Sequence, residues 1–246
     1  MAAALNEHIF VLPNAGALVE ATADQIVRVL AKAVRLRGRA ALALSGGSTP
    51  RLFFPILAAE PQLSAIPWER ISVFWADERC VPPDHPESNY GTAHELLLSK
   101  IPVSAHSIHR IRGELPPEEA TAHYVRELAV YFGGLPRFDL VLLGIGTDGH
   151  TASLFPGTTA LHAEDYACAV YAPWLEYWRI TLTLPVLNNA AHVMFIVSGS
   201  EKASVMRKLM NAETRRAYPA GRVRPGNGKL TWMCDAGAAS LLNNRG

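Results

Sequence analysis

An acidic side chain and an imidazole lie two residues apart on a glycine-rich segment of this 246-residue chain. The pair is Asp148 and His150, within residues 144–157, directly after the apolar run 140–143. A histidine titrates near neutral pH, so a neighbouring carboxylate can orient it as a general acid or base. A capped turn that carries a surface histidine is the alternative interpretation. We therefore treat this turn as a candidate for acid–base chemistry.

The same segment matches the G-x-G-x-x-G pattern of dinucleotide-binding loops, with acidic residues about 20 positions later. The glycines are Gly144, Gly146 and Gly149, and the acidic residues are Glu164 and Asp165. We reject a dinucleotide site because the acidic pair precedes the next apolar strand instead of ending it. In addition, Asp148 would face the pyrophosphate, and Pro156 with Gly157 would stop the helix that the motif needs.

A second polar segment has the composition of a phosphate-binding loop. Residues 45–50 read Ser-Gly-Gly-Ser-Thr-Pro and follow the apolar run 40–44. Glycines allow a ligand to approach the backbone closely, and Pro50 suits the first turn of a helix, whose N-terminus attracts anions. An ordinary turn with a helix cap explains the segment equally well. It is not a Walker A loop, because no Gly-Lys-Ser/Thr sequence follows.

Charged side chains occur on or directly after further apolar strands. Asp77, Glu78 and Arg79 follow the run 71–75, where burial without partners would be costly. They must be solvated, paired with one another or directed at a charged substrate. Arg179 lies on a strand, and Lys202 lies in the first turn of a helix, where the helix dipole disfavours a cation. An anionic ligand would offset that effect, and scattered surface cations are the alternative.

Apolar runs alternate with helix-period segments, which predicts the strands and crossover helices of a mostly parallel sheet. The predicted strands span residues 9–12, 40–44, 71–75, 140–143, 193–197 and 230–233, with weaker candidates at 167–171 and 179–184. The predicted helices span residues 17–36, 50–59, 89–98, 117–131, 200–210 and 235–242. Ligands of open α/β sheets bind beyond the carboxyl ends of the strands, so the four polar segments should converge on one pocket. Residues 218–228 should form a mobile surface loop that is too polar to pack.

Composition and chain ends exclude several classes of function. Lys and Arg number 23 against 22 Asp and Glu, so any anion site must be local, and neither nucleic acid nor a membrane surface is an expected partner. Cys80, Cys168 and Cys234 lack C-x-x-C spacing, which disfavours a disulfide framework or a thiolate zinc site. The start of the chain does not resemble a signal peptide, and no apolar run approaches the ~20 residues of a membrane helix. A cytoplasmic protein is expected.

Two other kinds of catalytic site are disfavoured. The chain contains no G-x-S-x-G elbow, which argues against a serine hydrolase. His106 and His109 are three residues apart, but they lie in a short connecting segment without a further ligand at matching spacing. The sequence therefore predicts no metal site.

Taken together, these segments resemble the 6-phosphogluconolactonases, a branch of the larger family that also holds glucosamine-6-phosphate deaminase. The resemblance rests on residues 45–50, 77–82 with 88–89, 144–157 and 179–183, and on Gly199 with Lys202. The run Asp-Gly-His-Thr-Ala-Ser-Leu-Phe-Pro-Gly at 148–157 is a long and specific match. The resemblance implies one α/β domain over residues 1–246, a three-layer α/β/α structure with a mostly parallel, Rossmann-like sheet of the NagB/RpiA/CoA transferase-like type. It also implies that no metal or organic cofactor takes part.

The resemblance implies roles for individual residues. The catalytic histidine falls on His150 with Asp148 beside it, and we group Asp77 with these two as a catalytic candidate. Arg79, like Asp77, would line the sugar pocket. The deaminase branch carries a glutamate where this chain has Phe155, which favours a lactonase. The residues expected to hold the sugar phosphate are Gly46, Gly47, Ser48, Thr49, Arg179 and Lys202.

The expected reaction is hydrolysis of 6-phospho-D-glucono-1,5-lactone to 6-phospho-D-gluconate, the second step of the oxidative pentose phosphate pathway. His150 would take a proton from the attacking water, and Arg79 or backbone amides of the glycine-rich turns would stabilise the oxyanion. Two rival hypotheses are a glucosamine-6-phosphate deaminase or isomerase, and a non-catalytic sugar-phosphate sensor. The expected partner is the small-molecule lactone, and the chain is expected to be a monomer or a weak homo-oligomer.

Overall fold

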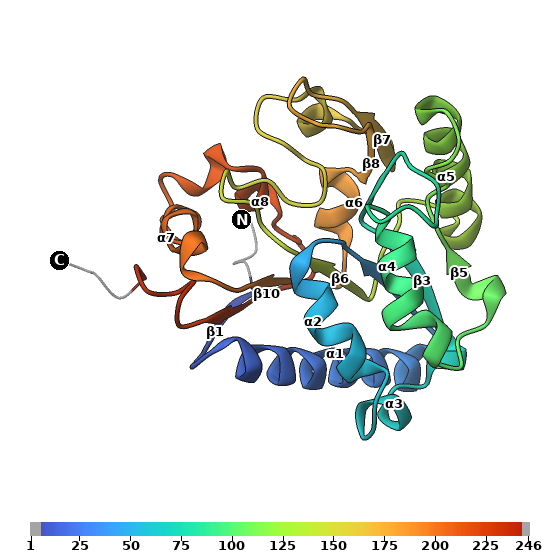
Figure 1. Cartoon of the computed structure of the whole chain (residues 1–246), viewed down its shortest axis with the longest axis horizontal. Helices are drawn as coiled ribbons and strands as arrows, with labels where there is room; N and C mark the ends of the chain where they lie inside the picture. Colours follow the sequence, from blue (N-terminus) through green and yellow to red (C-terminus); the bar gives the residue numbers. More distant parts are fainter. Residues whose placement is uncertain (1–5, 243–246) are drawn as a thin grey trace.

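The computed structural model describes residues 6–242 and has a parallel sheet at its centre (Figure 1). Within this range the sheet has seven strands in the order β1-β10-β9-β6-β2-β3-β5, and all its paired strands are parallel. The strands are β1 (Asn6–Leu12), β2 (Ala40–Leu44), β3 (Ile71–Trp75), β5 (Ile108–His109), β6 (Leu140–Leu143), β9 (His192–Val197) and β10 (Lys229–Asp235). The predicted α/β class with a mostly parallel sheet is confirmed.

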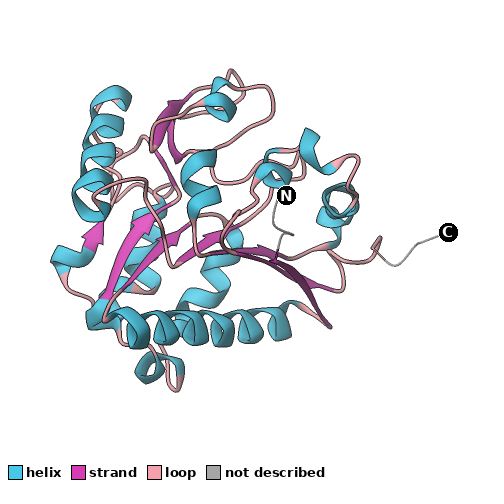
Figure 2. Ribbon diagram, turned by 180° about the vertical axis from the view of Figure 1, so that it is seen from behind, coloured by secondary structure: helices cyan, strands magenta, loops and turns pink. Residues whose placement is uncertain are grey.

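Helices cover both faces of this sheet (Figures 1 and 2). They are α1 (Ala15–Arg37), α2 (Ser48–Leu57), α3 (Gln62–Ala65), α4 (Asn89–Leu96), α5 (Pro117–Phe132), α6 (Leu184–Asn189), α7 (Ala203–Met210) and α8 (Pro219–Arg222). α1 runs along one face, and in both views α6, α7 and α8 lie on the other side. α1 begins where the Asn14 side chain accepts a hydrogen bond from the Ala17 amide, and it ends at Gly38, whose φ of 74° is left-handed. No helix within residues 6–242 is long and apolar enough to cross a membrane.

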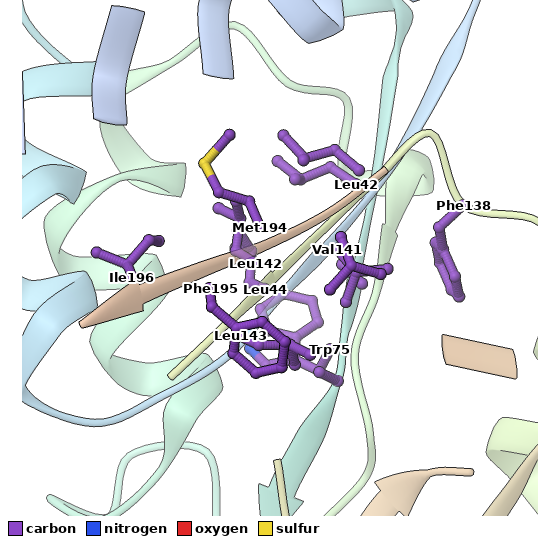
Figure 3. Packing of buried hydrophobic residues seen from close by; sticks show 14 of the residues in the cluster. Leu42, Leu44, Trp75, Phe138, Val141, Leu142, Leu143, Met194, Phe195 and Ile196 are labelled. Carbon is purple, nitrogen blue, oxygen red and sulfur yellow. The ribbon is translucent and has the colours of Figure 1, made fainter. Parts of the chain in front are cut away.

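The hydrophobic core fixes the strands whose ends carry the polar segments. β2 reads Ala-Ala-Leu-Ala-Leu, and all its residues are buried, as expected for a central strand covered on both faces. Figure 3 shows buried side chains from β2, β6 and β9 on both faces of the sheet. The register places Leu42, Leu142 and Met194 on one face and Val141, Leu143 and Phe195 on the other. Phe195 also stacks on Trp232 of β10, with ring centroids 4.1 Å apart. Since these parallel strands run in the same direction, their carboxyl ends share one edge of the sheet.

A smaller antiparallel sheet continues from the carboxyl end of β3. Within the described chain it has three strands, β4 (Asp77–Arg79), β8 (Arg179–Leu182) and β7 (Ala167–Val170), in the order β4-β8-β7. The two weaker strand candidates therefore do form strands, but in this second sheet. The sequence does not predict β4, because three consecutive charged residues show no apolar alternation. The register places Arg79 directly opposite Arg179.

The predicted helix at 235–242 is wrong. β10 continues to Asp235, and residues 236–242 form turns. The Asp235 carboxylate accepts hydrogen bonds from the amides of Gly199 and Ala238 and from the Ser198 hydroxyl. An aspartate that bonds to nearby backbone amides favours a turn over a helix. The small and apolar residues that follow Asp235 do not reveal these long-range bonds.

The prediction that residues 218–228 are too polar to pack is also wrong. α8 lies within this segment, and Ala220 is fully buried. The Asn188 side chain donates to the Arg222 carbonyl at 3.2 Å, and the Ala220 amide donates to the Gly149 carbonyl at 3.0 Å. Hydrogen bonds from other segments thus satisfy backbone groups that would otherwise face water. The segment consequently supports the turn that carries His150.

Candidate active site

A cavity of about 480 Å³ opens beyond the carboxyl ends of β2, β3, β6 and β9. Among the residues expected to form the site, Asp148 contacts His150 but does not line this cavity within the described chain. The others do line it: Gly46, Gly47, Ser48, Thr49, Asp77, Arg79, His150, Arg179 and Lys202. The four polar segments therefore converge as expected from the topology.

The turn that carries His150 depends on glycine at two positions. Gly149 has a φ of 80°, and a Cβ on Gly146 would lie 2.1 Å from Nδ1 of His150. The Gly146 amide donates to the His150 carbonyl at 2.9 Å and closes the turn. Asp148 Oδ1 lies 2.6 Å from Nδ1 of His150 and also accepts its backbone amide at 3.1 Å. Because a carboxylate can only accept, Nδ1 carries the proton and Nε2 is the basic nitrogen.

Phe155 forms an apolar wall beside the imidazole. Its ring centroid lies 4.6 Å from that of His150, and the side chain is nearly buried in the cavity wall. A phenylalanine offers neither a charge nor a hydrogen bond to a substrate amino group. Phe155, the residue that the resemblance predicts to separate a lactonase from a deaminase, thus lies against the candidate base His150.

Asp77 is held by a residue that we did not single out from the sequence. Ser153 Oγ donates to Asp77 Oδ2 at 2.7 Å, and the Ser153 amide donates to Thr181 Oγ1 at 3.2 Å. Both Asp77 and Ser153 are buried and line the cavity. These bonds join β4, β8 and the segment after His150. Ser153 lies within the specific run 148–157, so the motif indicated that this residue matters. The motif could not indicate that Ser153 binds Asp77, which lies 76 residues earlier in the chain.

Arg79 and Arg179 face each other across β4 and β8, and both line the cavity. The Nε atoms of both are buried without a hydrogen-bond partner among residues 6–242. Burial, followed by the charge of Arg79, lowers the pKa of Arg179 from its usual value. The Glu87 carboxylate lies 3.4 Å from Nη1 of Arg79, but half of its side chain is exposed. Two partly desolvated cations with incomplete compensation form a favourable site for an anion.

The 45–49 loop contributes a second group of anion-binding donors. Ser45 Oγ donates to the Leu142 carbonyl at 2.8 Å, and Gly47 turns the chain with a φ of 97°. α2 begins at Ser48, earlier than the predicted start at residue 50. Within the described chain no side chain caps this helix, so the amides of its first turn are available to a ligand. The hydroxyls of Ser48 and Thr49 lie in the same turn.

Lys202 reaches the cavity from a short 3₁₀ segment, Ser200–Lys202, that precedes α7. Gly199 begins this segment with a φ of 101°, and its amide donates to Asp235 Oδ2 at 3.0 Å. Burial raises the pKa of Asp235, but hydrogen bonds from Ser198 and nearby amides outweigh this effect and lower it. An ionised Asp235 therefore anchors the segment that carries Lys202. Sequence reasoning missed this role because it placed Asp235 in a helix.

The described side chains do not form a metal-binding cluster. Within residues 6–242 no group of three or more His, Cys, Asp or Glu side chains could hold a metal ion. His109, one of the two histidines considered above, instead places Nδ1 2.9 Å from Glu127 Oε2 and stacks on Phe74. This histidine is therefore part of the packing between β5 and α5.

Comparison with known proteins identifies the family. The model of the family described as glucosamine-6-phosphate isomerases/6-phosphogluconolactonase matches residues 13–232. The chain belongs to this family. The resemblance drawn from the motifs is thereby confirmed, and the family match includes the segments that form the cavity.

Relatives named 6-phosphogluconolactonase align with nearly the whole chain. The human protein is 40% identical over 231 residues, which cover 92% of this chain and 88% of the relative. The protein of Nostoc sp. is 37% identical over 245 residues, covering 97% and 100%. The solved structure of 6-phosphogluconolactonase from Trypanosoma brucei has a TM-score of 0.85 at 26% identity, covering 97% and 100%. A monomeric glucosamine-6-phosphate deaminase shares the fold, with a TM-score of 0.80 at 21% identity, covering 95% and 99%.

Proposed function

We propose that this protein hydrolyses 6-phospho-D-glucono-1,5-lactone to 6-phospho-D-gluconate. One observation carries the proposal: a single cavity contains both an imidazole whose Nε2 makes no hydrogen bond within residues 6–242 and two arginines whose Nε atoms lack a partner in the same range. The substrate has matching parts, a reactive ester carbonyl and a phosphate. Relatives named 6-phosphogluconolactonase, at 37–42% identity over most of the chain, support the proposal.

The phosphate of the substrate binds at the cationic side of the cavity. Arg79, Arg179 and Lys202 supply charge, and the first turn of α2 supplies amides and hydroxyls. The binding energy of this remote group then orients the lactone carbonyl beside His150. Asp77, fixed by Ser153, accepts hydrogen bonds from sugar hydroxyls at the same wall.

Ring opening needs one proton carrier. His150 Nε2 takes a proton from water as the water oxygen attacks C1, and a tetrahedral intermediate forms. The resulting imidazolium, stabilised by Asp148, returns the proton to the ring oxygen as the bond between that oxygen and C1 breaks. The products are a carboxylic acid, which ionises, and a free hydroxyl group. A positioned general base contributes about 10²–10⁴-fold, which suits an ester that is already activated.

The contact between Phe155 and His150 favours hydrolysis over deamination. A deaminase must move protons to and from an amino sugar, and the deaminase branch has a glutamate at the place of Phe155. Here an apolar ring lies 4.6 Å from the imidazole and cannot carry a proton. We therefore expect no ammonia from glucosamine 6-phosphate.

The test is a lactone-opening assay against the spontaneous background. Glucose 6-phosphate and its dehydrogenase generate the lactone in situ, and the protein should accelerate ring opening. His150→Asn should lower turnover by about 10²–10⁴-fold with little change in ligand affinity, whereas the exposed His106→Asn should behave as the parent. Ammonia release from glucosamine 6-phosphate at a comparable rate would support the deaminase alternative. Binding of 6-phosphogluconate without any turnover would support a sensor.

A further inference from the structure

The three charged side chains of β4 do not share one face. Successive side chains of a strand point to opposite sides, so Asp77 and Arg79 share one face and Glu78 takes the other. Asp77 and Arg79 line the cavity. Glu78 points into the protein and is only 2% exposed. This carboxylate therefore needs an explanation other than solvation or direct contact with a substrate.

Donors from the described chain satisfy the Glu78 carboxylate. Oε1 accepts the backbone amides of Arg79 and Asn89 at 2.7 and 2.8 Å. Oε2 accepts the Tyr90 amide at 2.7 Å and the Ser88 hydroxyl at 3.1 Å. Such bonds favour the ionised form, because a protonated carboxyl group must use one oxygen as a donor. The carboxylate thereby ties β4 to the first residues of α4.

Two of these donors belong to residues that shape the cavity. Arg79 is one half of the arginine pair, and Asn89 begins α4 and also lines the cavity. The Asn89 side chain donates to the Asp77 carbonyl at 2.9 Å. Its Oδ1 packs against Gly46, where an added Cβ would lie 1.7 Å away. Glu78 therefore connects β4, α4 and the 45–49 loop, which form three parts of the cavity wall.

We propose that Glu78 is a positioning residue whose carboxylate holds Arg79 and Asn89 in the geometry that binds the phosphorylated substrate. The proposal rests on the proposed lactonase function. Glu78 acts through its two neighbours and does not touch the substrate. His150 and Asp148 lie on a separate turn that is closed by its own hydrogen bonds. The contribution of Glu78 therefore falls on substrate binding more than on proton transfer.

The charge on Glu78 changes near neutral pH. Burial, with a smaller contribution from the charge of Asp77, raises the pKa of Glu78 to about 7, although hydrogen bonds from the amides of Asn89, Tyr90 and Arg79 oppose this rise. The charged or titratable groups around it are Asp77, Arg79, Cys80, Tyr90, Arg110 and Arg179. Guanidinium groups keep their charge at neutral pH, and burial raises the pKa of Cys80 to about 11. The hydrogen-bonded arrangement is thus complete above pH 7 and is lost as Glu78 is protonated.

The decisive variant is Glu78→Gln, which has nearly the same size but puts an NH₂ group against a donor. At pH 8.5 we expect kcat/KM to fall about ten- to a hundredfold, mainly through a higher KM, because hydrogen bonds to a charged group are lost. The ratio of kcat/KM between parent and variant should approach one below pH 6. This ratio cancels the pH effects that the parent and the variant share, including ionisation of the substrate phosphate. Glu119→Gln, at an exposed position on α5, is the matched control.

Thermal unfolding separates positioning from a purely structural role. Because the pKa of Glu78 is raised in the folded chain, ionisation disfavours folding, so the parent loses stability relative to Glu78→Gln as the pH rises through 7. The ratio of kcat/KM between the parent and Glu78→Gln should instead rise over the same pH range. An activity ratio that is independent of pH, or a loss confined to kcat, overturns the proposal.

A second variant covers the case in which Glu78→Gln does not fold. Glu78→Asp keeps the charge on a shorter side chain, and we expect a raised KM with kcat within about threefold of the parent. An unchanged KM with a lowered kcat overturns the proposal here too. The activity of the parent enzyme separates a failure of the proposed function from a failure of the role proposed for Glu78. If the parent shows no lactone hydrolysis, the proposed function fails; if the parent is active and the variants do not behave as stated, only the role of Glu78 fails.

Discussion

The contact between Asp148 and His150 allows a quantitative prediction for Asp148→Asn. The variant keeps the shape of the side chain and an oxygen that can accept the His150 amide. It removes the negative charge that faces Nδ1 at 2.6 Å and that stabilises the imidazolium. A hydrogen bond to a charged group contributes about 1.5–3 kcal/mol, and 1.4 kcal/mol corresponds to a tenfold change in rate. The side chains of His150 and Asp148 are 34% and 49% exposed, so water compensates for part of the loss.

We therefore expect turnover by Asp148→Asn to fall about 10- to 50-fold, toward the lower end of that range. Single-turnover opening of the lactone measures the chemical step, and calorimetric titration with 6-phosphogluconate measures binding. Affinity should stay within about twofold of the parent, because the lost charge acts on the imidazolium and not on the phosphate. Asp24→Asn, at an exposed position on α1, is the control. Turnover within twofold of the parent, or an affinity loss as large as the turnover loss, would refute the reasoning.

Three further predictions concern anchoring, backbone geometry and stability. Arg179→Ala and Lys202→Ala should each weaken 6-phosphogluconate binding about ten- to a hundredfold with a smaller effect on saturated turnover, because each removes a charge-assisted hydrogen bond. Calorimetry checks this, and unchanged affinity contradicts it. Gly149→Ala should abolish most turnover, because φ is 80° and the new Cβ would lie 2.5 Å from Tyr218 Cδ1. Normal turnover in the same lactone assay would show that the turn tolerates a side chain. Arg215→Met should lower the free energy of unfolding by about 1–3 kcal/mol, since it leaves the partly buried Glu7 carboxylate without its bidentate partner. Burial raises the pKa of Glu7, but hydrogen bonds from Arg215 and Trp232 outweigh this and lower it below 4.5. The difference in urea denaturation should therefore be present at pH 7 and shrink as the pH falls below about 4.5; a difference that persists in acid would contradict this.

The sequence predicts the central sheet because the relevant information is local. Residues 40–44 and 140–143 are short apolar runs, and both are buried strands in the structure. Parallel strands place their carboxyl ends on one edge, so the polar segments that follow must meet there. For this reason the positions of the 45–49 loop, His150 and Lys202 in one cavity could be predicted without knowing any contact. Arg179 lies on β8 of the antiparallel sheet, so this rule does not place it.

The contacts that hold these residues could not be predicted, because they join distant parts of the chain. Ser153 binds Asp77 and Glu78 binds Asn89 through hydrogen bonds that no local pattern encodes. The wrong helix at 235–242 has the same origin. Its apolar spacing suits a helix, but the Asp235 side chain bonds to the 198–199 segment and turns the chain. The segment 218–228 packs for a similar reason, through Asn188.

The arrangement of cations explains how a nearly neutral chain can select an anionic substrate. The formal net charge is +1, so no long-range field draws the substrate in, and selection depends on the cavity. Like charges directly opposite each other on neighbouring strands destabilise a sheet, and Arg79 and Arg179 have this arrangement. On the proposed function, we expect a bound phosphate to offset this repulsion and to accept hydrogen bonds from the guanidinium groups. A ligand that binds only the folded state stabilises it by about 2.7 kcal/mol at a hundred times its Kd. We therefore infer that this charge pair, which costs the sheet stability, serves phosphate binding, since a structural role alone does not account for two arginines placed opposite each other.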